Sequence, residues 1–159
     1  MTEFYFAYGS NMNSERMKAR QVQFDRCFAG SLPNTALKFN KRAPSAGSGH
    51  ANVAYAPGSR VEGVVYRVSG EPCMRALDQF ESAPRAYSRE IFWLSVEGKP
   101  LAAWVYIGNQ AALAEDLVPE RWYLNHLLAG KQYLSAKYYQ QLQTTPCLDI
   151  DPPDRPVHL

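Results

Sequence analysis

The stretch Phe6–Asn13 reads FAYGSNMN and follows the run EFYFAY over residues 3–8. Alternation of residue types along this run predicts a core strand. Gly9, Ser10 and Asn11 then bend the chain and offer polar groups where the strand ends. The stretch is therefore either an ordinary turn or a polar cradle at the end of a core strand.

Length and composition indicate one domain. The chain has 159 residues, of which 46% are hydrophobic and 13% aromatic, enough for one sizeable core. The net charge is +2, from 17 basic and 15 acidic residues. Basic residues cluster only weakly and form no long stripe, so we expect solvated faces and no nucleic-acid partner (Arg16/Lys18/Arg20, Lys38/Lys41/Arg42 and Arg85/Arg89). A basic pocket for a small anion remains an alternative.

The cysteines and histidines show no metal-binding pattern. The three cysteines form no CxxC pair, and their odd number favours free thiols in a reducing compartment (Cys27, Cys73 and Cys147). The histidines lack metal-ligand spacing, so no metal is expected (His50, His126 and His158). No signal segment and no apolar run near the ~20 residues of a membrane span are visible. These features predict a cytoplasmic protein without a membrane partner.

Hairpins dominate the predicted elements. Besides the first strand, six strands are expected, over 26–33, 35–41, 51–56, 60–69, 87–96 and 100–108. Turns are expected at Pro33-Asn34 and Pro57–Ser59, and a mobile loop at 43–50. Four helices are expected, over 13–20, 70–82, 119–130 and 133–143. With no regular βαβ alternation, the pattern predicts an α+β domain with a curved mixed sheet that can close as a barrel, followed by a proline-rich tail.

Glu81 is the carboxylate that the pattern singles out. Met74, Leu77 and Phe80 form an apolar helix stripe, and Glu81 lies at its border. Pro84 ends the helix, which places Glu81 in the last turn, where the helix dipole disfavours an anion. Burial and the dipole both raise the pKa of a carboxyl group, toward the range of a general acid or base.

Two other interpretations of this helix end remain open. Glu81 turns outward, or it pairs with Arg85 or Arg89 in a structural salt bridge. Asp78, one turn earlier, is a weaker candidate that we expect to be solvated.

The polar stretch after the first strand offers backbone donors. Gly9 permits unusual backbone angles, so successive N–H groups can point at one site. A helix opening after residue 13 would add donors from its N-terminus. Such a loop can bind a carboxylate or a developing oxyanion.

Several segments resemble the gamma-glutamylcyclotransferase-like family in identity and order. They are YFAYGSNM (5–12), GVVY (63–66), ALDQFES (76–82), Tyr87 and RWYLNHLLAG (121–130). The match runs from about Glu3 to Gln143. The resemblance implies a small mixed β-barrel flanked by helices, one domain over 1–143, and a tail over 144–159 that packs on it or frays.

The resemblance also implies an activity and its residues. The family converts gamma-glutamyl compounds to 5-oxoproline and a free amine without a metal or cofactor. By position, Glu81 is the acid/base, and Tyr8, Gly9, Ser10 and Asn11 bind the glutamyl moiety of the small-molecule substrate. Tyr87 and Tyr123 match tyrosines that line the family's pocket. Asn11 stands where the glutathione-specific branch tends to have leucine.

Two rival functions remain. Ser82-Ala83-Pro84 follows the glutamate where many members have glycine, which leaves open a non-catalytic small-molecule binding module on the same fold. Thiol chemistry, with Cys73 or Cys147 as nucleophile and His126 as base, is the other. The oligomeric state is left open, with a homodimer as one option.

Overall fold

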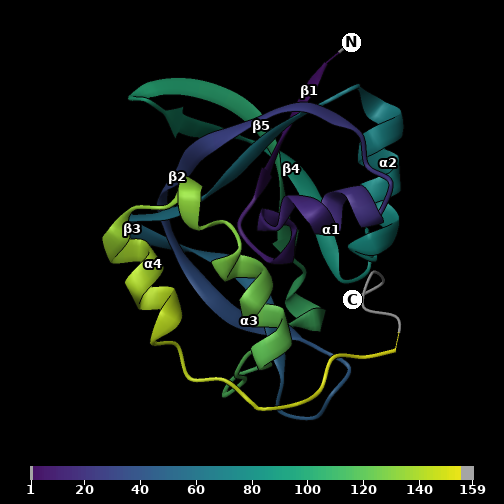
Figure 1. The fold of residues 1–159 in the computed structure, drawn as a ribbon, viewed down its shortest axis with the longest axis vertical. Coiled ribbons are helices and arrows are strands. Elements are labelled where there is room, and N and C mark those ends of the chain that lie inside the picture. Colours follow the sequence, from purple (N-terminus) through teal and green to yellow (C-terminus); the bar gives the residue numbers. More distant parts are fainter. Residues whose placement is uncertain (1, 155–159) are drawn as a thin grey trace.

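A closed sheet forms the centre of the fold (Figure 1). The computed structural model describes residues 2–154. Its strands are β1 (Glu3–Ala7), β2 (Phe24–Arg42), β3 (Gly49–Val68), β4 (Tyr87–Val96) and β5 (Lys99–Gly108). The order around the sheet is β1-β3-β2-β4-β5, and β1 meets β5 in parallel while the other pairs are antiparallel. The predicted α+β class with a mixed, closed sheet is confirmed.

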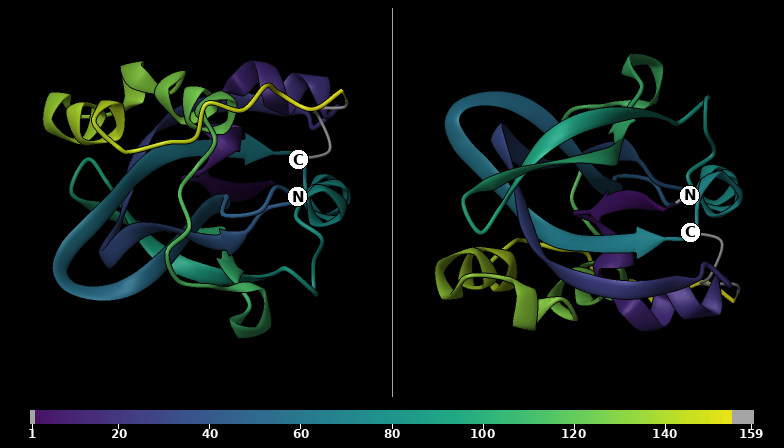
Figure 2. Two further views of the ribbon diagram at one scale, coloured as in Figure 1. Left: turned by 90° about the horizontal axis from the view of Figure 1, so that it is seen from below. Right: turned by 90° about the horizontal axis from the view of Figure 1, so that it is seen from above.

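Helices cover the sheet on one side and at one end. Figure 2 shows α1 (Ser14–Ala19), α3 (Arg121–Leu128) and α4 (Ala136–Gln143) in a row along one side, with α2 (Glu71–Phe80) at an end. Three short 3₁₀ turns accompany them, η1 (Ser10–Met12), η2 (Gln110–Ala112) and η3 (Lys131–Tyr133). Each predicted helix is present and shorter than expected. For α1 and α4 the caps set the start, since Asn13 and Ser135 accept hydrogen bonds from Glu15 N and Tyr138 N.

The prediction of four short strands over residues 26–69 was wrong. β2 and β3 are two long strands paired from Phe24↔Val68 to Arg42↔Gly49. The turn residues lie opposite each other in a bulge, where Gly58 N donates to Asn34 Oδ1 over 3.1 Å. Asn34 and Gly58 have φ of 57° and 82°, so both strands bend together instead of ending.

The loop at the tip of this hairpin is shorter than predicted. Gly49 and His50 belong to β3, which leaves residues 43–48 as the connection. Ser48 is buried and forms a bridge to Val118, and Gly49 N donates to Val118 O over 2.9 Å. These contacts tie the base of the loop to the segment before α3.

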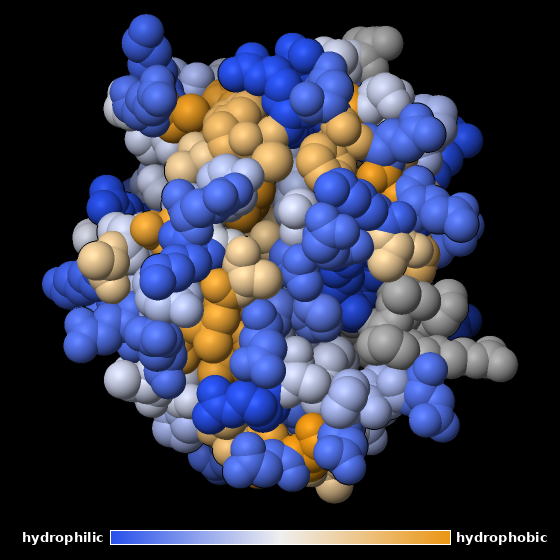
Figure 3. Space-filling view, in the orientation of Figure 1, coloured by the Kyte–Doolittle hydropathy of each residue, from blue (hydrophilic) through white to orange (hydrophobic). Residues whose placement is uncertain are grey.

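The core fills the closed sheet and the inner faces of the helices. Phe6, Val64 and Tyr66 are almost fully buried, and Met74 and Leu77 confirm the predicted inner face of α2. On the face in Figure 3, hydrophilic residues are interspersed with strips of hydrophobic ones. No helix within residues 2–154 is long and apolar enough to cross a membrane.

The segment after α4 contacts the start of α3. Leu148 N donates to Pro119 O over 2.9 Å, and Arg121 N donates to Leu148 O over 2.8 Å. A parallel bridge between Glu120 and Leu148 joins the same two segments. Residues 155–159 of the predicted tail lie outside the described residues.

Candidate active site

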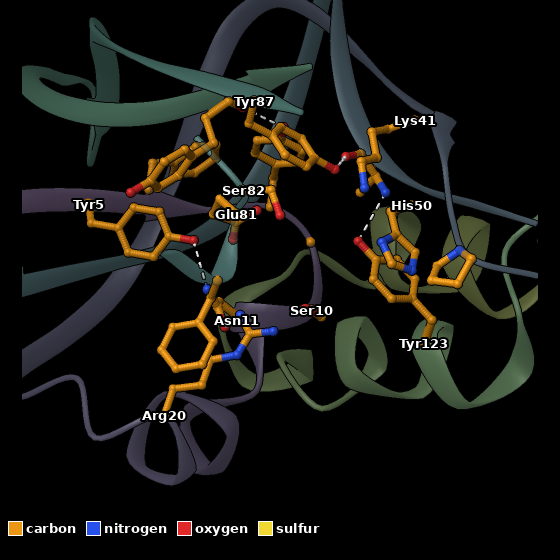
Figure 4. A pocket seen from close by; sticks show the side chains of 17 residues that line it. Tyr5, Ser10, Asn11, Arg20, Lys41, His50, Glu81, Ser82, Tyr87 and Tyr123 are labelled. Atoms are coloured by element: carbon orange, nitrogen blue, oxygen red, sulfur yellow. Dashed lines mark hydrogen bonds between the residues drawn. The ribbon is translucent and has the colours of Figure 1, made fainter. Parts of the chain in front are cut away.

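One pocket collects all of the site residues suggested by the sequence. It has a volume of about 190 Å³ and lies between the end of β1, η1, the end of α2, the tip of the β2–β3 hairpin and α3 (Figure 4). The predicted residues that line it are Tyr8, Gly9, Ser10, Asn11, Glu81, Tyr87 and Tyr123. Segments more than a hundred residues apart thus meet at one site.

Glu81 caps the C-terminal end of α2. Its N–H donates to Leu77 O over 3.0 Å, and its side chain lines the pocket. Burial raises the pKa of the Glu81 carboxyl, while positive charge on Arg20, Lys41 and Arg16 opposes the rise. Within residues 2–154, no side-chain hydrogen bond or salt bridge joins Glu81 to another residue. The outward and salt-bridged interpretations of Glu81 are therefore wrong.

Arg89 is paired elsewhere, and so is Asp78. Arg89 Nη2 lies 2.5 Å from Glu71 Oε1, and Arg89 Nε donates to Asp78 Oδ1 over 2.8 Å. Tyr106 OH donates to the same Asp78 oxygen over 2.7 Å. The expectation that Asp78 is a solvated helix residue was wrong, because this network holds its carboxylate against β4 and β5.

The backbone at the end of β1 forms the polar cradle. η1 begins at Ser10, and no acceptor within residues 2–154 pairs with the N–H groups of Ser10 and Asn11. Gly9 has φ of −111°, which is not a left-handed conformation. Glycine is favoured here because neighbouring atoms approach its Cα closely. A Cβ at Gly9 would lie 3.3 Å from Ala51 Cβ, a contact that requires a neighbour to move.

Asn11 is fixed by three hydrogen bonds. Arg20 Nη1 donates to Asn11 Oδ1 over 3.0 Å, and Asn11 Nδ2 donates to Tyr5 OH over 3.1 Å. Tyr66 OH donates to the backbone O of Asn11 over 2.6 Å. The amide orientation follows from Arg20, which can only donate.

Arg16 and Arg20 are buried, which corrects the expectation of a solvated basic face. Their spacing of four residues places both on one side of α1, against η1. Arg16 Nε donates to Ser10 Oγ over 3.1 Å. Burial lowers the pKa of both guanidinium groups, and negative charge on Glu81 counteracts this in each case.

The hydroxyl groups of Tyr87 and Tyr123 both form hydrogen bonds with the backbone of Ala51. Tyr87 OH donates to Ala51 O over 2.7 Å, and Ala51 N donates to Tyr123 OH over 2.9 Å. Tyr8 OH similarly donates to the backbone O of Tyr106. Tyr8 and Tyr87 thus use their hydroxyl protons for structure, whereas the Tyr123 hydroxyl accepts. Burial raises the pKa of all three phenols.

The pocket also contains residues that the sequence analysis did not assign to the site, among them Tyr5, Lys41, His50 and Tyr106. Lys41 Nζ lies 5.5 Å from the centre of the Tyr87 ring, and burial lowers its pKa. The His50 ring stacks on Tyr123 at 4.3 Å, and burial lowers the pKa of His50 to about 3. Lys41 and His50 flank the hairpin loop, and only the fold shows that both line the same pocket.

Among residues 2–154, neither a cluster of metal ligands nor a cysteine lines this pocket. Within residues 2–154, no three metal-ligating side chains gather at one point. Cys73 and Cys147 do not line the pocket, and His126 Nδ1 lies 3.0 Å from Asn13 Nδ2. The structure therefore contradicts a Cys73/His126 or Cys147/His126 pair in this pocket.

Comparison with known proteins identifies the family. A family model described as "Gamma-glutamyl cyclotransferase, AIG2-like" matches residues 5–125. The chain belongs to this family. The matched segment contains every residue of the pocket named above, from Tyr5 to Tyr123.

Solved structures of similar fold agree with this assignment. A gamma-glutamyl cyclotransferase superposes with a TM-score of 0.80 at 24% identity, covering 94% of this chain and 91% of its own. An uncharacterized protein from Homo sapiens gives 0.81 at 25%, with the same coverage. YkqA from Bacillus subtilis gives 0.79 at 19%, covering 92% of this chain and 56% of its own. No curated protein matches the chain.

Ser82, where the sequence departs from the family pattern, has φ of 51°. This left-handed conformation favours glycine, yet serine adopts it here next to Glu81. Ser82 therefore forms a left-handed bend directly after Glu81, and it also lines the pocket.

Proposed function

We propose that this family member converts a gamma-glutamyl amine or gamma-glutamyl amino acid to 5-oxoproline and the free amine. The α-amine of the glutamyl group attacks its own γ-carbonyl carbon, forming the ring C–N bond, and the bond to the leaving amine then breaks. No water or metal takes part. The free state of all three cysteines supports a reducing, cytoplasmic setting.

Glu81 is the proposed general acid/base, and its position in the pocket carries the proposal. Attack requires that the α-ammonium lose a proton, and departure requires that the leaving nitrogen gain one. A carboxylate whose pKa is raised by burial suits both steps, because it accepts a proton and returns it near neutral pH. Its carboxylate has no structural partner among the described residues, which leaves it available to the substrate.

The cradle at the end of β1 binds the glutamyl moiety in this proposal. The N–H groups of Ser10 and Asn11 face no protein acceptor within residues 2–154 and suit a carboxylate. Lys41 and Arg20 line the same pocket and add positive charge for the α-carboxylate of the substrate. Binding both ends of the glutamyl group bends it, so that the amine lies ~3–3.5 Å from the carbonyl carbon.

Tyr8, Tyr87 and Tyr123 shape the pocket wall. Tyr8 and Tyr87 are fixed through their bonds to backbone oxygens, so they act mainly as rigid surfaces. The Tyr123 hydroxyl accepts from Ala51 N and can still donate to the ligand. The 43–48 loop, anchored at Ser48 and carrying Pro44 at the pocket, is positioned to select the leaving amine.

Release of 5-oxoproline tests the proposal. The purified chain is incubated with gamma-glutamyl amines and gamma-glutamyl amino acids, and 5-oxoproline and the free amine are quantified together. Equal amounts of both products are expected. Glu81→Gln should lower kcat by ~10²–10⁴-fold, since it removes the acid/base with little change of shape.

Glu90→Gln is the matched control, because Glu90 is an exposed glutamate on β4. It should leave kcat unchanged. Activity that survives Glu81→Gln would remove Glu81 from the mechanism. Binding of a gamma-glutamyl compound with no product from the unchanged chain would favour the binding module instead.

A further inference from the structure

Tyr5 lies in the pocket with a hydroxyl proton that the protein does not use. Its oxygen accepts from Asn11 Nδ2 over 3.1 Å. No acceptor for the Tyr5 O–H is found within residues 2–154. Tyr5 is 4% exposed, so its ring is fixed while its hydroxyl faces the pocket (Figure 4).

The orientation of this hydroxyl follows from a chain of three groups. The Arg20 guanidinium has only donors, so the Asn11 oxygen must face it. The Asn11 amide nitrogen therefore faces Tyr5 and can only donate to it. Tyr5 oxygen accepts this bond, and its proton must point elsewhere. A positive charge at one end of such a chain strengthens the donor at the other end.

Glu81 lies in the same part of the pocket. Negative charge on Glu81 is, after burial, the main cause that raises the pKa of Tyr5 far above its ordinary value, so Tyr5 keeps its proton. The ring is held by neighbours, stacked on Tyr66 at 6.1 Å and edge-on to Tyr106 at 5.8 Å. Tyr5 is thus a rigid, neutral donor beside the proposed acid/base.

We infer that Tyr5 is a further catalytic residue of the proposed reaction, whose hydroxyl donates a hydrogen bond to the γ-carbonyl oxygen of the glutamyl group. This inference rests on the proposed function. The carbonyl carbon must lie where Glu81 can serve both its attacking and its leaving nitrogen, so the carbonyl oxygen lies close to Glu81. When the ring C–N bond forms, this oxygen becomes negative, and the Tyr5 bond strengthens. No proton leaves Tyr5, because Glu81 carries the one that moves.

Tyr5→Phe tests the inference, since it removes the hydroxyl and keeps the ring. The expected result is a fall in kcat of about 10²-fold with KM changed by less than about threefold, the pattern of a bond made mainly in the transition state. The acidic limb of the pH profile of kcat/KM should stay in place. Tyr138→Phe is the matched control, because its buried hydroxyl has no partner within residues 2–154 and lies outside the pocket.

Asn11→Asp is a second variant, which tests the orientation of the donor. The new carboxylate cannot donate, so the Tyr5 proton turns toward it and away from the substrate. kcat should fall, and the substitution should add little to the loss already caused by Tyr5→Phe. If the kcat losses of Asn11→Asp and Tyr5→Phe multiply in the double variant, the hydrogen bonds from Arg20 through Asn11 to Tyr5 do not orient the Tyr5 proton.

Three results would overturn the inference. A kcat of Tyr5→Phe within about threefold of the unchanged chain would rule out a catalytic role for Tyr5, and so would a rise in KM alone, which indicates ground-state binding only. A shifted acidic limb would show that Tyr5 acts through Glu81. If the unchanged chain releases no 5-oxoproline, the proposed function and this inference fall together, whereas the other results affect Tyr5 alone.

Discussion

Gly9 and Tyr123 approach so closely that a Cβ at residue 9 would lie 3.0 Å from the Tyr123 hydroxyl oxygen. The same hydroxyl accepts from Ala51 N, which ties α3 to the start of β3. Residue 9 therefore sets how far the cradle can approach the far wall of the pocket.

Gly9→Ala should displace Tyr123 and weaken its bond to Ala51. A fall in kcat/KM of about tenfold is expected, because small displacements of a bound substrate reduce the population of reactive geometries. Steady-state kinetics with a gamma-glutamyl substrate measures this. In a Tyr123→Phe background the same substitution should cost less, since the hydroxyl that it meets is gone. An equal cost in both backgrounds would show that Tyr123 is not the group displaced.

Glu81→Gln should raise the stability of the fold at neutral pH. The pKa of Glu81 is raised in the folded state, so its contribution is most favourable below its unfolded value of about 4.3 and is lost as the pH rises through the folded pKa. Glutamine avoids this loss. Urea denaturation should show a larger difference between variant and parent at pH 7 than at pH 4. A variant less stable than its parent at pH 7 would contradict the raised pKa.

His50 should make the fold less stable in mild acid. Burial, with the nearby charges of Lys41, Arg16 and Arg20, lowers the pKa of His50 to about 3. A lowered pKa gives stability that is present above the unfolded value of about 6.5 and is lost as the pH falls. The loss from His50 between pH 7 and pH 5 should be about 2 kcal/mol.

His50→Phe keeps a flat ring against Tyr123 and removes the titration. Denaturation at both pH values should show a smaller acid loss than in the parent. His126, whose pKa is lowered to about 4 by burial, contributes to the same slope and should account for part of what remains. An unchanged slope in His50→Phe would mean that His50 is not the group that titrates.

Arg89→Met should destabilise the fold by about 1–3 kcal/mol, because it removes the cation of Asp78 and leaves Glu71 only Arg75, whose Nε lies 3.7 Å from Glu71 Oε1. The value is below that of a fully buried pair, since the Asp78 and Glu71 side chains are 25% and 43% exposed. Arg85→Met is the control at an exposed position and should stay within about 0.5 kcal/mol of the parent in thermal or urea unfolding. Equal effects of both substitutions would show that the network contributes little.

The sequence predicted the parts of the site that depend on local order along the chain. The glycine bend after β1 and the glutamate at the end of α2 both follow from strand, helix and proline signals, and the structure places them at one pocket. Tyr5 escaped notice because it reads as one of several core aromatic residues. Its role depends on the orientation of Asn11, which only the contact with Arg20 defines.

The misread elements share a physical cause. Pro33-Asn34 and Pro57–Ser59 carry turn signals, but the two segments lie opposite each other in the β2–β3 pair. The two strands are paired both before and after this bulge, so they continue through the bend. In the sequence, Arg16 and Arg20 look like solvated helix residues. In the structure, side-chain oxygens of η1 accept hydrogen bonds from both guanidinium groups. Local patterns cannot show a partner that lies on another element.

The long β2–β3 hairpin carries one wall of the pocket at its tip, while the other walls come from β1, α2 and α3. No continuous fragment that stops before Tyr123 contains every wall, so a chain emerging from the ribosome acquires the complete pocket only after α3 has emerged. Protection from proteolysis by a gamma-glutamyl ligand would therefore report on the completed chain, and partial fragments would remain susceptible.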